Sequence, residues 1–273
     1  MRLIAALLIL LVTLPASLPA RAQTVSILTY HRFNPDHAPG ATTVTTRTFA
    51  AQMNRIAALG IPVIPLRALF DGTALPPRAI AITADDGHRS VFTEMFPILK
   101  AHRFPATLFL NPPGLGQGSY LRFPELLEMQ ASGLVDCEPH TISHPNFNTE
   151  RARRGPEAFT AYLRHELEDS RTALRNRLGG PQDLLAWPFG IHDPALEAAA
   201  EAAGYTAAFA LGGRAAPVNA PKFAIPRYQV YETDLGARFD AVLAGIPRGG
   251  ARLPPPDKSG NSVRTGQASG EPP

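Results

Sequence analysis

The chain has 273 residues, 45% of them hydrophobic, and a formal net charge of +3. These values are typical of a globular protein and exclude the class of strongly charged proteins. Most of the excess positive charge lies near the two ends, so the calculated isoelectric point of 9.2 gives no reason to expect nucleic acid as a partner. A single cysteine, Cys137, excludes an internal disulfide.

The first residues have the pattern of a secretory signal peptide. Arg2 precedes an apolar stretch from Leu3 to Leu14, and Ala20 and Ala22 form a small-residue cleavage pattern before Gln23. A membrane anchor is the alternative, but the apolar stretch is shorter than the roughly 20 residues that cross a bilayer. We therefore expect cleavage and a secreted or periplasmic protein with no stable membrane span.

The remaining chain divides into one domain and a tail. Residues 247–273 are rich in proline, glycine and serine, contain almost nothing apolar, and are predicted to be disordered. Residues 23–246 are long enough for one domain with a sizeable core. The predicted organisation is thus a signal peptide (1–22), one domain (23–246) and a disordered tail (247–273).

Short β-rich runs alternate with helical patterns along this domain. Strands are predicted at 25–30, 79–84, 106–110, 184–187 and 206–210. Helices are predicted at 49–59, 89–102, 156–178 and 194–203, and most of them end at a glycine. This alternation indicates an α/β fold with a mostly parallel sheet, either open or closed as an irregular barrel. Ligands of such folds bind at the carboxyl ends of the strands.

Two carboxylates follow the second predicted strand. Asp85 and Asp86 come directly after a buried-type run and precede Gly87, which allows a tight turn. Adjacent acids repel each other unless a cation lies nearby. A solvated Asp-Asp-Gly turn is the alternative.

Two histidines stand four residues apart, at His140 and His144. Either alone would usually be a surface residue, but imidazole is also the commonest side-chain metal ligand. Two histidines and one carboxylate are the ligand set of an open catalytic zinc site. A third segment, from Leu185 through Trp187 and Phe189 to Gly190, has the pattern of a strand that ends in a turn; by itself it indicates only a buried tryptophan.

These three segments, in this order, resemble the motifs of carbohydrate esterase family 4, the NodB-type polysaccharide deacetylases. The resemblance implies an irregular (β/α) barrel with outer helices and an enzyme that removes N-acetyl groups from a polysaccharide. Its implied roles are a general base for Asp85, metal ligands for Asp86, His140 and His144, and an oxyanion and substrate site at Phe189 and Trp187.

The segment from Leu28 to Leu69 is similar to the branch with exported, circularly permuted poly-N-acetylglucosamine deacetylases. In that branch a histidine near the start, here His31, serves as the general acid; His192 is the alternative. The usual arginine of the third motif is replaced by Ala186, and the late Leu-x-His motif is absent. We expect Arg227 to support Asp85 instead, although the same departures would also fit a weakly active member.

The implied cofactor is a divalent metal, with zinc the first choice and cobalt, nickel or iron as alternatives. The implied partner is an N-acetylated polysaccharide whose identity the sequence leaves open. Two other function classes are considered: a catalytically silent polysaccharide-binding relative, and a metal-dependent amidase acting on another acylated substrate.

Other patterns are set aside. The glycines at 114, 116 and 118 lack the spacing of a nucleotide-binding loop, and no Gly-x-Ser-x-Gly motif is present. The pair His165-Glu166 lacks the second histidine of a zinc-protease helix and is interpreted as a solvated helix face. Cys137 is interpreted as a small apolar residue of a strand rather than a thiolate ligand.

Overall fold

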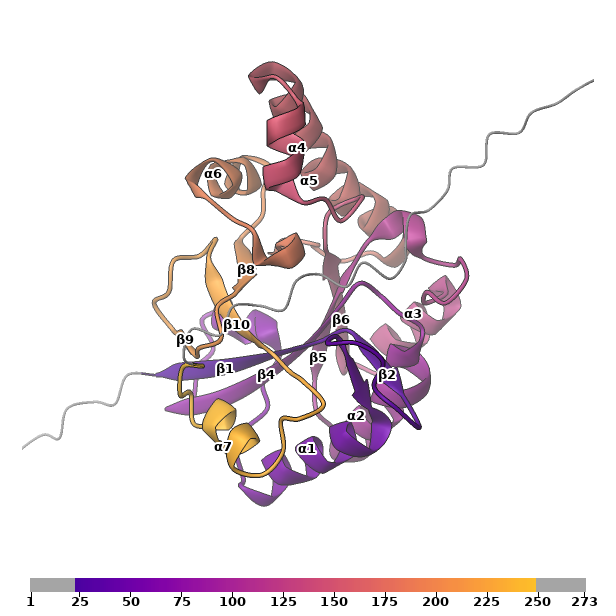
Figure 1. Cartoon of the computed structure of the whole chain (residues 1–273), viewed down its shortest axis with the longest axis vertical. Helices are drawn as coiled ribbons and strands as arrows, with labels where there is room; N and C mark the ends of the chain where they lie inside the picture. The colour runs from indigo at the N-terminus through magenta and orange to yellow at the C-terminus, as the bar shows by residue number, and fades with distance from the viewer. Residues whose placement is uncertain (1–22, 249–273) are drawn as a thin grey trace, which may run out of the picture.

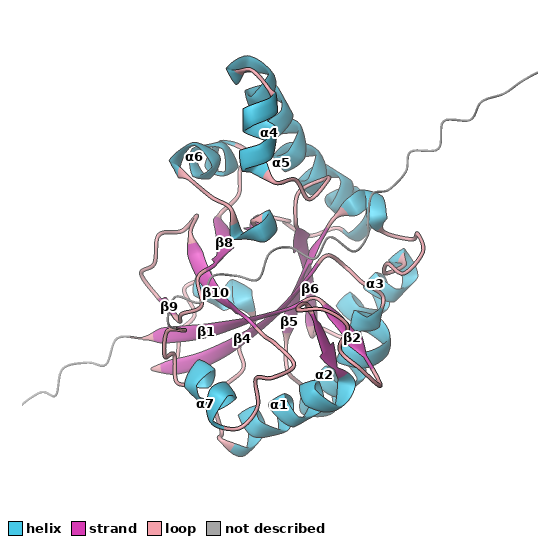
Figure 2. Cartoon of the chain, viewed as in Figure 1, coloured by secondary structure: helices cyan, strands magenta, loops and turns pink. Residues whose placement is uncertain are grey.

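Parallel strands surrounded by helices form a nearly closed barrel (Figure 1, Figure 2). The computed structural model describes residues 23–248. The predicted signal peptide and all but the first two residues of the predicted tail lie outside this range.

The main sheet has the strand order β6-β5-β4-β1-β10-β8-β7, with short β9 pairing antiparallel to β1. The strands are β1 (Thr24–Tyr30), β4 (Arg78–Asp85), β5 (Ala106–Leu110), β6 (Val135–Pro139), β7 (Leu184–Ala186), β8 (Ala207–Leu211), β9 (Ala216–Pro217) and β10 (Ile225–Gln229); β2 (Arg32–Asn34) and β3 (Thr43–Thr45) pair separately. The helices are α1 (Thr46–Ala58), α2 (Phe96–His102), α3 (Phe123–Ala131), α4 (Phe147–Arg153), α5 (Pro156–Leu178), α6 (Pro194–Ala202) and α7 (Ala237–Leu243).

The predicted fold class is confirmed, and the five predicted strands correspond to β1, β4, β5, β7 and β8. The helix predicted at 156–178 has the bounds of α5. The helix predicted at 89–102 is confirmed over nearly all of its length, although residues 91–95 are π-helical before α2 begins at Phe96. Strands β6 and β10 complete the barrel and are not among the five predicted strands, although the interpretation of Cys137 as a strand residue agrees with its place in β6.

Side chains alternate between the inside and the outside of the barrel, as the two-residue period of a strand requires. The inner core contains Val25, Ile27, Ala79, Ala81 and Phe109, together with residues of β7 and β8. The alternate residues of β1, β4 and β5 pack outward against α1, α2 and α3, and those of β7 and β8 pack against α5 and α6. Figure 1 shows α4, α5 and α6 on one side of the barrel and α1, α2 and α7 on the opposite side.

A seam between β6 and β7 keeps the barrel from closing completely, since no described backbone ladder joins these two strands. Side chains bridge it instead. The backbone N–H of Leu184 donates to Glu138 at 3.0 Å, and Gln182 Nε2 donates to the carbonyl of Cys137 at 3.3 Å. Arg67 binds carboxylates from both sides of the seam, Glu138 on β6 and Asp183 before β7. Polar side chains therefore hold the two edge strands together.

Candidate functional site

The inward-facing side chains at the carboxyl ends of the strands define the site. Asp85 is the last residue of β4 and continues the inward series of Ala79, Ala81 and Thr83. The parallel pairing of β1 with β4 places Tyr30 beside Ala84, so the next residue, His31, follows β1 on the same rim as Asp85. Residues far apart in the sequence therefore meet at one end of the barrel, where α/β folds bind their ligands.

Arg227 makes a bidentate ion pair with Asp85. Its Nη1 and Nη2 atoms donate to the two carboxylate oxygens at 2.8 and 2.7 Å, and Nη1 also lies 3.2 Å from Thr83 Oγ1. Both side chains are almost fully buried. Burial alone raises the pKa of Asp85, but the charges of Arg227 and His140 and the hydrogen bonds of Arg227 outweigh burial and lower this pKa to about 2. Asp85 is therefore ionised at neutral pH.

Asp86, His140 and His144 converge on one point. The Asp86 Oδ1 atom lies 3.6 Å from the Nε2 atoms of both histidines, too far for hydrogen bonds, and it is buried with no hydrogen-bond partner. One ligand atom from each of the three residues lies within 4.8 Å of the other two. Bonds of about 2.0–2.1 Å in tetrahedral geometry place neighbouring ligand atoms roughly 3.3 Å apart. The donor set and its spacing thus fit a divalent metal ion.

The hydrogen bond of His140 prepares its ring for this role. His140 Nδ1 lies 2.7 Å from the carbonyl oxygen of Ala186, which can only accept, so Nδ1 carries the proton. The Nε2 lone pair is then free to face Asp86. Burial lowers the pKa of His140 to about 4 despite the nearby carboxylates, and the ring is neutral at pH 7.

Strained backbone shapes the loop that carries the two histidines. Thr141 and His144 have φ angles of 64° and 54°, which side chains other than glycine rarely adopt. Each such residue costs about 1–3 kcal/mol and persists only where its surroundings fix it. The fixing contacts come from Asn111 and Glu166, which the sequence analysis did not identify. Glu166 is 1% exposed, so the interpretation of His165-Glu166 as a solvated helix face is wrong for Glu166 and fits only exposed His165.

The third motif forms a turn beside the histidines. The Phe189 ring packs edge to face against the His144 ring, with the two ring centroids 4.6 Å apart. Phe189 is 39% exposed, so it borders the site. Gly190 is required here, because its φ is 67° and an added Cβ would lie 2.6 Å from the Leu211 backbone nitrogen. The Trp187 side chain is fully buried and donates Nε1–H to the carbonyl of Phe223. The prediction that Trp187 contacts substrate is therefore wrong for its side chain.

The two candidate acids have different surroundings. His31 lies close enough to Asp86 and Asp85 that its charge contributes to lowering the pKa of both carboxyl groups, although burial raises them. His192 instead pairs with Glu197 at the start of α6, with its Nδ1 atom 2.8 Å from Oε1. His31 thus follows β1 on the rim that carries the two aspartates, whereas His192 pairs with a glutamate of α6. Cys137 is buried within β6, and burial raises the pKa of its thiol, which does not suit a thiolate ligand.

Comparison with known proteins defines the class. A sequence model of the polysaccharide deacetylase family matches residues 72–208, half of the chain, from before β4 into β8. The chain belongs to this family, which confirms the resemblance seen in the motifs. Poly-beta-1,6-N-acetyl-D-glucosamine N-deacetylase from Staphylococcus aureus strain MRSA252 is 27% identical over 157 residues, 56% of this chain and 54% of that protein. The chain thus spans about half the length of the curated relatives that it matches.

Solved structures share the barrel over most of the described residues. A de-N-acetylase from Aggregatibacter actinomycetemcomitans superposes with a TM-score of 0.73 at 19% identity, over 81% of this chain and all of that one. IcaB from Ammonifex degensii gives a TM-score of 0.70 at 24% identity, over 83% of this chain and 98% of that one. Identities this low show a common fold. Among residues 23–248, no helix has the length and apolar character needed to cross a membrane.

Proposed function

We propose that this chain is an exported, metal-dependent enzyme that hydrolyses N-acetyl groups of an N-acetylglucosamine polysaccharide. One observation carries the proposal: Asp86 Oδ1 is buried without a partner and faces two imidazole nitrogens, while the ionised Asp85 lies next to it. A buried carboxylate oxygen without a hydrogen bond is expensive unless a cation binds it. Family membership supplies the reaction class.

The described residues supply the proton transfers. A divalent cation held by Asp86, His140 and His144 would polarise the acetamide carbonyl and lower the pKa of the attacking water toward about 7. Asp85, fixed by Arg227, would accept the proton of that water. His31 would protonate the departing amine nitrogen, because an amine leaves only after protonation. The backbone N–H of Phe189 would donate to the developing oxyanion.

Zinc is the proposed metal, since two imidazoles and one carboxylate with an open position are typical of catalytic zinc sites. Cobalt, nickel and iron accept the same mixed nitrogen and oxygen ligands. Export is proposed from the signal-like residues 1–22. The substrate class is proposed from the name of the S. aureus relative, which acts on poly-beta-1,6-N-acetyl-D-glucosamine.

Acetate release tests the proposal. The protein, loaded with Zn²⁺ or Co²⁺, is incubated with poly-N-acetylglucosamine, chitin oligomers, peptidoglycan and small N-acetylated amides, and free acetate is measured. We expect release from a glucosamine polymer, and no release after the metal is removed with a chelator. Binding to polymer without any acetate release would instead identify a silent binding protein. Faster release from small amides than from polymers would identify an amidase of another class.

A further inference from the structure

Glu166, on the long helix α5, contacts the loop that carries both histidines. One of its carboxylate oxygens, Oε2, accepts the backbone N–H groups of Ile142 at 3.0 Å and Ser143 at 2.8 Å. The other, Oε1, accepts the Ser143 hydroxyl at 2.6 Å. A buried charge is thus satisfied by three donors, all of which belong to the segment between His140 and His144.

A second residue holds the same loop from the barrel side. Asn111, directly after β5, donates its Nδ2 atom to the carbonyl oxygens of His140 at 2.5 Å and Thr141 at 3.2 Å. Asn111 therefore binds two carbonyls of the loop, whereas Glu166 binds the next two N–H groups. Every peptide group from His140 to Ser143 has a carbonyl or an N–H fixed by one of these two side chains.

The loop needs this restraint because its backbone is unfavourable. Thr141 and His144 both have positive φ angles, and neither is glycine. If the hydrogen bonds to Glu166 were absent, Thr141 and His144 would be free to relax toward negative φ angles, which would move the His144 ring away from Asp86. His144 is 29% exposed, and within residues 23–248 no hydrogen bond to a barrel strand holds its ring as the Ala186 carbonyl holds that of His140. Its position therefore depends on the loop backbone and on ring contacts such as that with Phe189.

We infer that Glu166 is a positioning residue for the metal centre, which holds the loop so that His144 faces Asp86 and His140. This inference rests on the proposed function, since it assigns Glu166 to the same metal site. Glu166 lies outside all three motifs and acts through the backbone of the loop, not through the ion. Outer-shell partners of metal ligands typically contribute 10- to 100-fold to metal affinity.

Glu166→Gln tests the inference, because glutamine has the size of glutamate but replaces one acceptor oxygen with an NH₂ group. That group cannot accept the hydrogen bonds that Ile142 and Ser143 donate to Glu166. Glu168→Gln is the matched control: it makes the same substitution two residues away on the same helix, at an exposed position. The binding of Co²⁺ is followed by its visible absorption, alongside the thermal unfolding of the metal-free proteins. We expect the dissociation constant for Co²⁺ to rise at least tenfold in Glu166→Gln, with an altered spectrum, and to be unchanged in Glu168→Gln.

The outcomes separate this inference from the proposed function. If the parent protein binds Co²⁺ and folded Glu166→Gln binds it with the same affinity and spectrum, Glu166 does not position the site, while the proposed function stands. If the parent binds no Co²⁺, both fall. If Glu166→Gln does not fold, Ser143→Ala decides: it removes one of the three hydrogen bonds, and we expect severalfold weaker binding. Unchanged affinity in Ser143→Ala then overturns the inference.

Discussion

Replacing Arg227 by methionine should destabilise the metal-free protein strongly, because it leaves the Asp85 carboxylate buried without its counter-charge. Methionine keeps most of the length of the arginine stem and removes only the guanidinium. The two hydrogen bonds of 2.7 and 2.8 Å to Asp85 are lost, as is the contact with Thr83. No solvent replaces them, since the arginine and aspartate side chains are 1% and 4% exposed.

The size of the effect follows from the pKa of Asp85. A pKa of about 2, against the usual 3.8, corresponds to roughly 2.5 kcal/mol in favour of the ionised carboxyl group. Without Arg227 the effect of burial dominates, so this pKa should rise above 3.8. Removal of one partner from a buried ion pair typically costs about 3–5 kcal/mol, and we expect a loss in that range at pH 7.

The sign of the pH dependence gives a second readout. A lowered pKa contributes stability that is present above pH 3.8 and is lost as the pH falls toward about 2. The difference between parent and Arg227→Met should therefore be largest near neutral pH and shrink as the pH falls from the raised pKa of Asp85 in the variant toward about 2.

Urea unfolding at several pH values, in the presence of a chelator, measures both effects. Arg238→Met, at an exposed position on α7, is the matched control and should change the free energy of unfolding by less than about 0.5 kcal/mol. In an Asp85→Asn background, the loss caused by Arg227→Met should be smaller by about 2 kcal/mol or more, because no buried charge remains. A loss below 1 kcal/mol that is the same at every pH would refute the reasoning.

The other predictions concern the reaction and the metal. Alanine at any one of the three proposed metal ligands should abolish stoichiometric metal binding, measured by elemental analysis. Metal retained by all three alanine variants would contradict the ligand set. Asp85→Asn should instead keep the metal and lose acetate release. His31→Ala should lower the turnover of metal-loaded protein by roughly 100-fold or more, the scale of general acid catalysis, and His192→Ala should do much less; equal turnover in parent and His31→Ala would exclude the role. Burial lowers the pKa of His140 from 6.5 to about 4, so between these pH values the unfolded protein binds a proton at His140 that the folded protein does not. The metal-free protein should therefore lose up to about 3 kcal/mol of stability as the pH falls from 6.5 to 4, measured by urea unfolding. Equal free energies of unfolding at about pH 4.5 and 7 would contradict this.

The sequence predicted the elements with strong local patterns. The strand before Asp85 is a continuous apolar run, and α5 has proline at its start and glycine after its end, so both were recognised. Strand β10 was missed because Pro226 stands in its second position, and proline argues against a central strand. In strand β6, Val135 and Cys137 alternate with Asp136 and Glu138. The two acidic side chains face the inside of the barrel, where both form ion pairs with Arg67. The local sequence pattern does not reveal this distant partner.

The site was predictable only where it follows the family motifs. The convergence of Asp86, His140 and His144 was expected from the resemblance. Glu166 was misjudged because a glutamate on a helix that is polar overall looks solvated, and its burial depends on a loop that packs over one turn of that helix. Trp187 was assigned to the substrate because it lies within a motif, although the strand period turns its side chain away from the barrel. A tertiary contact thus decided the burial of Glu166, and the strand period decided the orientation of Trp187.

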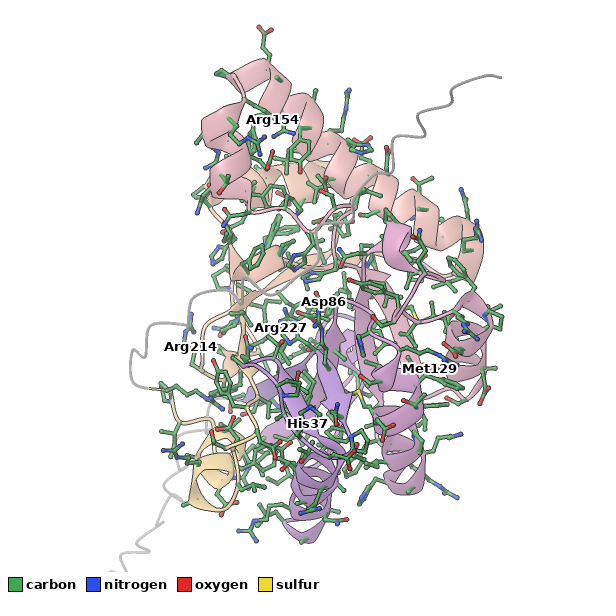
Figure 3. The ribbon with its side chains drawn as sticks, turned by 45° about the vertical axis from the view of Figure 1, so that its right-hand side comes forward. His37, Asp86, Met129, Arg154, Arg214 and Arg227 are labelled. Carbon is green, nitrogen blue, oxygen red and sulfur yellow. The ribbon has the colours of Figure 1, made fainter. Side chains whose placement is uncertain are left out.

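Figure 3 shows Asp86 and Arg227 close together in the middle of the molecule. The centre around Asp86 and the seam between β6 and β7 are two separate features of the barrel. His140 contributes to both features, because the ring that offers Nε2 to a cation also binds the Ala186 carbonyl across the seam. Binding of a cation at the proposed centre would therefore be thermodynamically linked to the cohesion of the two edge strands. A cation at a concentration 100 times its dissociation constant would add about 2.7 kcal/mol to the free energy of unfolding. Slower amide hydrogen exchange in β6 and β7 than in the rest of the barrel, on addition of metal, would be the local signature of that linkage.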